Sequence, residues 1–240
     1  MTSNKLKIIA CISMTLDHVG YLLFPKVVFL RYIGRLALPI FAFFIAEGCL
    51  HTRSKAKYLL QISALAIICQ LFYVGEALLN GGIRSIDLNI LFTFCLSIII
   101  SSSYLRLKST LQQKNKKMLP TDIILFIASL SLAVFCCTYL SELLGISVTI
   151  DYGLVGVLLP VSALLFSDKR KNLISFCVGT VIYCIVRAEI FPYTWFALLS
   201  LPLLFLYNGK RGTKKLKWPF YFFYPLHFAV IYGIHYLMSI

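Results

Sequence analysis

The sequence predicts an all-α fold: a polytopic membrane bundle of about nine transmembrane helices, with a cytoplasmic N-terminus and an outer C-terminus. Of the 240 residues, 60% are hydrophobic and only 13% are charged, and the mean hydropathy is +0.86. The apolar residues form long blocks that are apolar on all sides, as in helices surrounded by lipid or by other such helices. We therefore expect a single transmembrane domain over 1–240.

Nine apolar blocks are long enough, or nearly long enough, to cross a bilayer. They cover residues 6–24, 34–50, 57–79, 87–105, 121–141, 151–167, 172–188, 190–207 and 219–238. The second, sixth and seventh blocks are short for a span. Short spans can still cross where the bilayer thins or where neighbouring helices cover their ends.

The basic residues support this division because they alternate between the two sides of the predicted membrane. One side holds 18 of the 23, namely Lys5, Lys7, Arg53, Lys55, Lys57, Arg106, Lys108, Lys114, Lys116, Lys117, Lys169, Arg170, Lys171, Lys210, Arg211, Lys214, Lys215 and Lys217. The other side keeps Lys26, Arg31, Arg35, Arg84 and Arg187. The positive-inside rule makes the richer side cytoplasmic, with 106–120 as a basic cytoplasmic loop. Topology thus explains the net charge of +14, and we expect no nucleic-acid partner.

The first block contains two adjacent ionisable residues, Asp17 and His18, where lipid favours apolar side chains. Lys7 and His18 are eleven residues apart, which places them within about 20° of one helix face and about 16 Å apart along the axis. This stripe would suit an anionic cofactor that enters from the cytoplasm. Alternatively, Lys7 only extends to the membrane surface and His18 satisfies a neighbouring helix.

Asp17 lies about 100° around the helix from His18, so we expect the two side chains to meet different helices. Arg35, at the outer start of the second block, is the natural partner because a buried carboxylate needs a cation to stay ionised. The pair could be structural or catalytic. Within the second block, Pro39 predicts a kink that frees backbone carbonyls.

Other polar residues stand at the ends or in the middle of later blocks. Asn89, Asp151 and Tyr152 lie at outer starts, and His227, with Tyr224 nearby, lies near the middle of the last block. Two mid-membrane histidines beside an acid and an arginine fit proton transfer in a water-accessible cavity. Glu47 lies near the cytoplasmic end of the second block. The residues that follow, His51, Arg53, Lys55 and Lys57, form a cluster that could hold phosphates or only orient the span.

Five strings, taken together and in order, resemble the TraX family. They are "LKIIACISMTLDHVGYLL", "IGRLALPIFAFFIAEG", "LNILFTFCL", "DYGLVGVLLP" and "FYFFYPLHFAV", and they extend over nearly the whole chain. The family's founding member is linked to N-terminal acetylation of pilin. The family is similar to transmembrane acyltransferases of the type-3 and heparan glucosaminide N-acetyltransferase kind. Many type-3 enzymes carry Arg or Lys, ten residues and then His on the first helix, as Lys7 and His18 do here.

The resemblance implies a multi-pass bacterial inner-membrane acetyltransferase, with acetyl-CoA as donor, no metal, and an amine or hydroxyl acceptor on a surface protein, glycan or lipid. His18 is then the expected general base, with Asp17 as the second catalytic candidate. The remaining candidates divide into residues for the acceptor, Arg35, Asn89, Asp151, Tyr152, His227 and Tyr224, and residues for acetyl-CoA, Lys7, Glu47, His51, Arg53 and Lys57. The competing interpretations are a proton-coupled transporter and a non-catalytic membrane scaffold.

Overall fold

The chain folds as two helical units, seen in a computed structural model that describes residues 1–79, 82, 85–212 and 216–239. The first unit contains both ends of the chain, 1–44 and 177–240, and the second contains 45–176. Three residues of the predicted charge pattern, Arg84, Lys214 and Lys215, lie outside the described residues.

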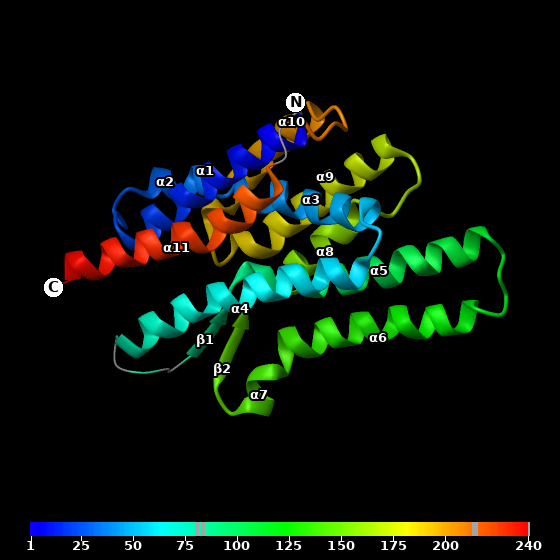
Figure 1. Cartoon of the computed structure of the whole chain (residues 1–240), viewed down its shortest axis with the longest axis horizontal. Helices are drawn as coiled ribbons and strands as arrows, with labels where there is room; N and C mark the ends of the chain where they lie inside the picture. Colours follow the sequence, from blue (N-terminus) through cyan, green and yellow to red (C-terminus); the bar gives the residue numbers. More distant parts are fainter. Residues whose placement is uncertain (80–81, 83–84, 213–215, 240) are drawn as a thin grey trace. The chain divides into compact units, whose positions relative to one another are not determined.

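The first unit pairs the ends of the chain. Its elements are α1 (Ser3–Leu22), α2 (Val28–Gly34), the start of α3 (Ala37–His51), the end of α9 (Lys169–Ala188), the 3-10 helix η1 (Pro192–Leu199), α10 (Ser200–Phe205) and α11 (Lys217–Ser239). Helix α2 folds back onto α1, and α11 also packs against α1 (Figure 1). Contacts of Lys7 with Phe220 and of His18 with Phe228 show that α1 and α11 run in the same direction.

Two glycines allow α1 and α2 to pack closely. A Cβ added to Gly20 would lie 2.7 Å from the Cβ of Leu30, and one added to Gly34 would collide with the side chain of Asp17. Small residues at such contacts are the usual means by which membrane helices approach each other. The hairpin therefore presses the backbone of α2 against Asp17.

The second unit is organised around α5 (Ile90–Gln112), which packs against α4 (Lys55–Leu79), α6 (Leu119–Thr138) and α8 (Gly153–Ser162). Ile100, Ala133, Val157 and Val161 form its buried apolar core. Hydroxyl groups of α5 reach the neighbouring backbone: Ser97 Oγ lies 2.7 Å from the carbonyl oxygen of Val157, and Thr93 Oγ1 lies 2.5 Å from that of Asp151. Such interhelical hydrogen bonds hold helices together where the solvent is apolar.

Large apolar side chains stand exposed along α4 and α6, including Leu60, Leu71, Ile124 and Ile127. Five helices of the described chain are long and apolar enough to cross a membrane: Val28–His51, which joins α2 and α3, Lys55–Gly75, Ile90–Gln112, Leu119–Thr138 and Lys169–Ala188. A soluble protein does not expose apolar faces of this extent, and the chain is accordingly a membrane protein. The number of nine spans and the sides of the termini stay predictions.

Two of the predicted blocks do not form one helix of span length. Block 151–167 contains only α8, which has ten residues, because the chain then turns and directs three carbonyl groups at Lys108. The Nζ of Lys108 lies 2.7 Å from the carbonyl oxygen of Phe166 and 2.9 Å from that of Leu164. Block 190–207 is divided between η1 and α10, with Pro192 opening η1 where its missing N–H has no cost.

The predicted kink and the predicted basic loop also need correction. The second block is interrupted at Arg35 and Leu36, whereas Pro39 lies in the first turn of α3, where backbone N–H groups have no helical partner anyway. The loop expected at 106–120 is helical up to Gln112, and α6 begins at Leu119. Arg106 and Thr110 extend α5 because both side chains bind the buried carboxylate of Asp122, at 2.5 Å and 2.6 Å.

The fold is nearly, but not entirely, all-α. Strands β1 (Ser85–Leu88) and β2 (Ser147–Ile150) pair in parallel, with Ser85 opposite Ser147 (Figure 1). A short helix, α7 (Leu140–Leu144), precedes β2. Side chains occupy both outer edges: Gln70 of α4 donates to the Asp87 carbonyl at 2.9 Å, and Ser141 of α7 bonds both the N–H and the carbonyl of Val148. Edges closed in this way do not recruit further strands.

Candidate active site

The carboxylate of Asp17 is held by two arginines from α2 and its C-terminal cap. Arg35 Nη2 lies 2.5 Å from both carboxylate oxygens, which confirms the predicted pair. Arg31 Nη1 lies 3.1 Å from Oδ2 and also donates to the Asp17 carbonyl at 3.2 Å. Arg31 was not predicted as a partner of Asp17, because the second apolar block begins only at residue 34. The signal was available, since Arg31 and Arg35 are four residues apart and share one helix face.

Aromatic rings of η1 support these arginines. The ring of Tyr193 lies 5.2 Å from the guanidinium carbon of Arg35 and 5.6 Å from that of Arg31, and Tyr32 stacks on Phe196 at 4.3 Å. Asp17 and Arg35 are both buried. Two cations bind both oxygens of the carboxylate, an arrangement that fixes α1 against α2. The predicted catalytic role of Asp17 stays a prediction.

His18 uses one ring nitrogen locally and leaves the other available. Its Nδ1 lies 2.9 Å from the carbonyl oxygen of Met14. A carbonyl can only accept, so Nδ1 carries the proton of the neutral imidazole and the lone pair is on Nε2. Within the described part of the chain, Nε2 makes no hydrogen bond. An imidazole in this tautomer is a proton acceptor through Nε2.

His227 of α11 repeats this arrangement opposite His18. The ring centroids are 5.3 Å apart, and His227 Nδ1 lies 3.2 Å from the carbonyl oxygen of Phe223. Its Nε2 is buried and has no hydrogen-bond partner among the described residues. A buried, unsatisfied ring nitrogen is costly and is rare in folded proteins. His18 and His227 thus share one tautomer, and each has a lone pair on Nε2. They are the candidate proton acceptors of the first unit.

The surroundings of the two histidines are aromatic. Phe228 lies 4.8 Å from the ring of His18 and 4.3 Å from that of His227, and Tyr224 contacts His227 edge-on at 5.3 Å. Lys7 lies on the same face of α1, with Nζ 4.9 Å from the ring of Phe44 and 6.0 Å from that of Phe220. The predicted stripe from Lys7 to His18 is thus confirmed as one face of α1 that meets α11.

The other candidate residues belong to the second unit. His51 pairs with Glu47 at 3.4 Å, and Arg53 and Lys57 are exposed around the turn between α3 and α4. His51, Arg53 and Lys57 are exposed and so accessible to a phosphate, whereas Glu47 is partly buried. A role of the four residues in binding acetyl-CoA stays a prediction.

Asn89 has a structural role that accounts for its side chain. Its Oδ1 caps α5 by accepting the Leu91 N–H at 3.1 Å, and its Nδ2 donates to the Ala66 carbonyl at 2.9 Å and to Gln70 Oε1 at 3.0 Å. Both amide hydrogens are used, and the residue is buried. The predicted role of Asn89 in substrate binding stays a prediction.

Asp151 and Tyr152 form the turn that opens α8. The Asp151 N–H donates to the Leu88 carbonyl at 3.2 Å, which ties the turn to β1. Tyr152 has a φ of 64°, an unusual conformation for a residue with a bulky side chain. Such strain is a reason to suspect function but does not identify one. For both residues, acceptor binding stays a prediction.

Comparison with known proteins agrees with the resemblance of the sequence strings. The family model described as "TraX protein" matches residues 2–235. The probable fimbrial assembly protein FimC, serogroup H1, of Dichelobacter nodosus is 26% identical over 95% of this chain and 93% of its own length. An uncharacterised protein of Rickettsia prowazekii (strain Madrid E) is 49% identical over 41 residues, 17% of this chain and 16% of its own. No solved structure matches the chain. Since the family match covers nearly all of the sequence, the chain belongs to the TraX family.

Proposed function

We propose that this chain is an inner-membrane acetyltransferase that moves an acetyl group from cytoplasmic acetyl-CoA to an acceptor amine. The observation that carries the proposal is the free Nε2 of His18 in a neutral tautomer, facing a second imidazole with the same free nitrogen. General bases need a lone pair aimed at the proton that is removed. Membership of the TraX family supplies the reaction class, through the family's link to pilin acetylation.

In the proposed step, His18 Nε2 takes a proton from the acceptor nitrogen while that nitrogen attacks the thioester carbon. The tetrahedral oxyanion collapses, the C–S bond breaks, and the sulfur leaves as CoA thiolate. The proton on His18 then passes to that thiolate, so the base is regenerated. Asp17, Arg31 and Arg35 act as positioning residues, since they fix the turn of α1 that carries His18. Lys7, on the same face of α1 as His18, attracts the CoA phosphates.

The tautomer of His227 favours an amine over a hydroxyl acceptor. Because Nδ1 faces the Phe223 carbonyl, Nε2 has a lone pair and no proton. It is therefore unsuited to donate to an oxyanion but suited to accept an N–H. A primary amine has one N–H for each imidazole, whereas a hydroxyl has a single proton. The D. nodosus relative is named a fimbrial assembly protein, and the N-terminal amine of a surface-fibre subunit is the acceptor we propose.

The test measures free thiol released from acetyl-CoA by purified protein, together with acetylation of surface-protein N-termini by mass spectrometry. Replacing His18 by Gln should lower transfer by about 10²- to 10⁴-fold, the usual contribution of a general base. His235→Gln, on the same helix as His227, is the matched control and should retain activity. Full transfer by His18→Gln protein that inserts normally would remove the assignment. A pH-driven solute flux in proteoliposomes without any response to acetyl-CoA would indicate a transporter instead.

A further inference from the structure

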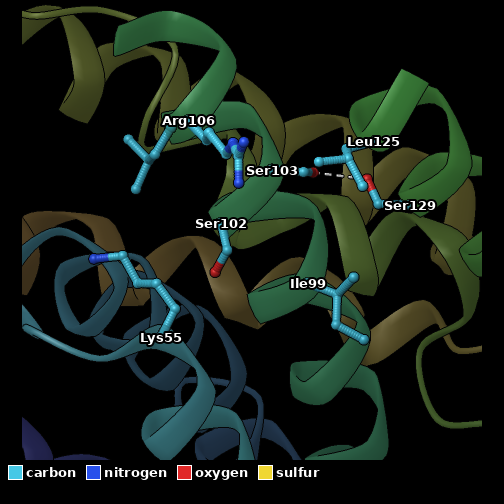
Figure 2. A pocket seen from close by; sticks show the side chains of 8 residues that line it. Lys55, Ile99, Ser102, Ser103, Arg106, Leu125 and Ser129 are labelled. Atoms are coloured by element: carbon cyan, nitrogen blue, oxygen red, sulfur yellow. Dashed lines mark hydrogen bonds between the residues drawn. The ribbon is translucent and has the colours of Figure 1, made fainter. Parts of the chain in front are cut away.

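A pocket of about 530 Å³ lies in the second unit, over the C-terminal half of α5. It is bordered by Lys55 at the start of α4 and by Arg106 of α5, and Leu125 and Ser129 of α6 line the other side (Figure 2). The volume is within the range of small-molecule sites. None of its lining residues has a role in the proposed transfer reaction.

Arg106 is fixed in a way that presents part of its guanidinium outward. Its Nε donates to the buried Asp122 carboxylate at 2.5 Å, and Asp122 is held in turn by Thr110 at 2.6 Å. The Arg106 side chain is 51% exposed, and its two terminal nitrogens make no hydrogen bond in the described residues. A planar fork of N–H donors that is already oriented is the preferred partner of a phosphate group.

The rest of the lining is mainly apolar, with one unsatisfied polar group. Ile99, Leu105 and Leu125 supply the apolar walls, and Leu125 is 43% exposed. Ser103 and Ser129 bond each other at 2.8 Å, as Figure 2 shows. Ser102 Oγ, in contrast, is buried and has no partner among the described residues. The pocket thus offers an anion site at Arg106, a hydrogen-bond donor at Ser102 and an apolar wall.

We propose that this pocket binds one anionic phospholipid. Its phosphate lies on the terminal nitrogens of Arg106, an ester oxygen accepts from Ser102, and one acyl chain follows Ile99 and Leu125. The walls come from three helices that qualify as membrane spans, and α4 and α6 expose apolar faces. Lipid molecules therefore surround the pocket at high local concentration. Arg106 and Lys55 lie at the same end of the antiparallel helices, the end that the charge pattern assigns to the anionic cytoplasmic leaflet.

The experiment compares purified protein in phosphatidylcholine nanodiscs with and without phosphatidylglycerol, and measures retained lipid by native mass spectrometry and the Tm of unfolding. Phosphatidylglycerol should be retained and should raise the Tm of the unaltered protein. Ser102→Leu, which fills the pocket, should abolish both effects. Ser102→Ala leaves the pocket open and removes only one hydrogen bond, so it should weaken retention several-fold without abolishing it. Arg106→Lys keeps a charge beside Asp122 but loses the fork, and should weaken retention about tenfold.

Two further variants of this chain keep the test decisive if a single substitution impairs folding. The double variant Arg106→Gln with Asp122→Asn removes both charges together and should fold but lose phosphatidylglycerol. Lys116→Gln removes an exposed charge from the following turn and should behave as the unaltered protein. Retention of phosphatidylglycerol by the Ser102→Leu and double variants at the level of the unaltered protein would overturn the proposal. So would stabilisation by acetyl-CoA that depends on Arg106 in the absence of any phosphatidylglycerol effect, because the phosphate source would then be the cofactor.

Discussion

Asp17 and Asp122 are both buried carboxylates that bind arginine, yet the two regions use the same pair differently. At Asp17 two arginines bind the carboxylate, and Arg35 is itself buried, so its charge is neutralised within the protein and is not available to a ligand. At Asp122 the single arginine, Arg106, is half exposed, and the hydroxyl of Thr110 donates a hydrogen bond to the second carboxylate oxygen. The arrangement at Asp17 holds the helical turn that carries His18. The arrangement at Asp122 holds Arg106 through its Nε and leaves the terminal nitrogens of its guanidinium directed outward.

In both regions the acid positions a neighbouring group, and that group carries the proposed chemistry. In the first unit that group is the free nitrogen of His18, and in the second it is the outer edge of Arg106. The two acids should therefore differ in what their loss costs, and that difference can be measured.

The largest expected effect is on stability when each acid becomes its amide. Asp17→Asn leaves buried, uncompensated guanidinium charge and should lower the free energy of unfolding by about 3–5 kcal/mol. Asp122→Asn leaves an arginine that reaches solvent and should cost only about 1 kcal/mol. Unfolding in mixed micelles of increasing dodecyl sulfate content measures both. Equal losses would show that the two pairs are energetically alike.

Next in size is a pair of glycine substitutions with opposite signs. Gly34→Ala places a methyl group into the Asp17 side chain, and it should destabilise the protein by about 3 kcal/mol through overpacking. Gly75→Ala, in α4, meets nothing within 4 Å. It should gain about 0.5–1 kcal/mol, since alanine is the better helix former. The same unfolding assay applies, and a tolerated Gly34→Ala would show that α2 can move away from α1.

Contacts that follow from local chemistry were predictable from the sequence, whereas contacts that depend on distant packing were not. The Asp17–Arg35 pair was predictable because a carboxylate in an apolar block requires a cation, whichever fold surrounds it. The His18–His227 pair was predictable only as two histidines at similar depth, since their contact depends on packing of chain ends. The strands at 85–88 and 147–150 were not predicted, because four alternating residues at the edges of long apolar blocks carry little signal without their distant partner.

A smaller effect is expected at Asn89, whose side-chain hydrogen bonds join α4 and α5. Asn89→Ala removes the cap of α5 and the two bonds donated by Nδ2, although Gln70 Oε1 keeps the backbone N–H of residue 89, so the loss should be about 2 kcal/mol. Asn89→Asp restores the cap but not the donated bonds, so it should recover only part of the stability. If Asn89 instead binds the acceptor, Asn89→Ala would reduce acetyl transfer at temperatures where the protein remains fully folded.

The smallest change in stability, and the sharpest division between packing and function, is expected at His227. Phenylalanine has a similar shape, would keep the stacking on Phe223, and would remove the buried nitrogen that has no partner in the described residues. His227→Phe should therefore unfold at the same denaturant content or gain about 1 kcal/mol, because an unsatisfied polar group has been removed. Transfer to an amine should nevertheless fall steeply, since one of its two hydrogen-bond acceptors is lost. A variant that is as stable as the unaltered protein and equally active would assign His227 to packing alone and leave His18 as the sole base.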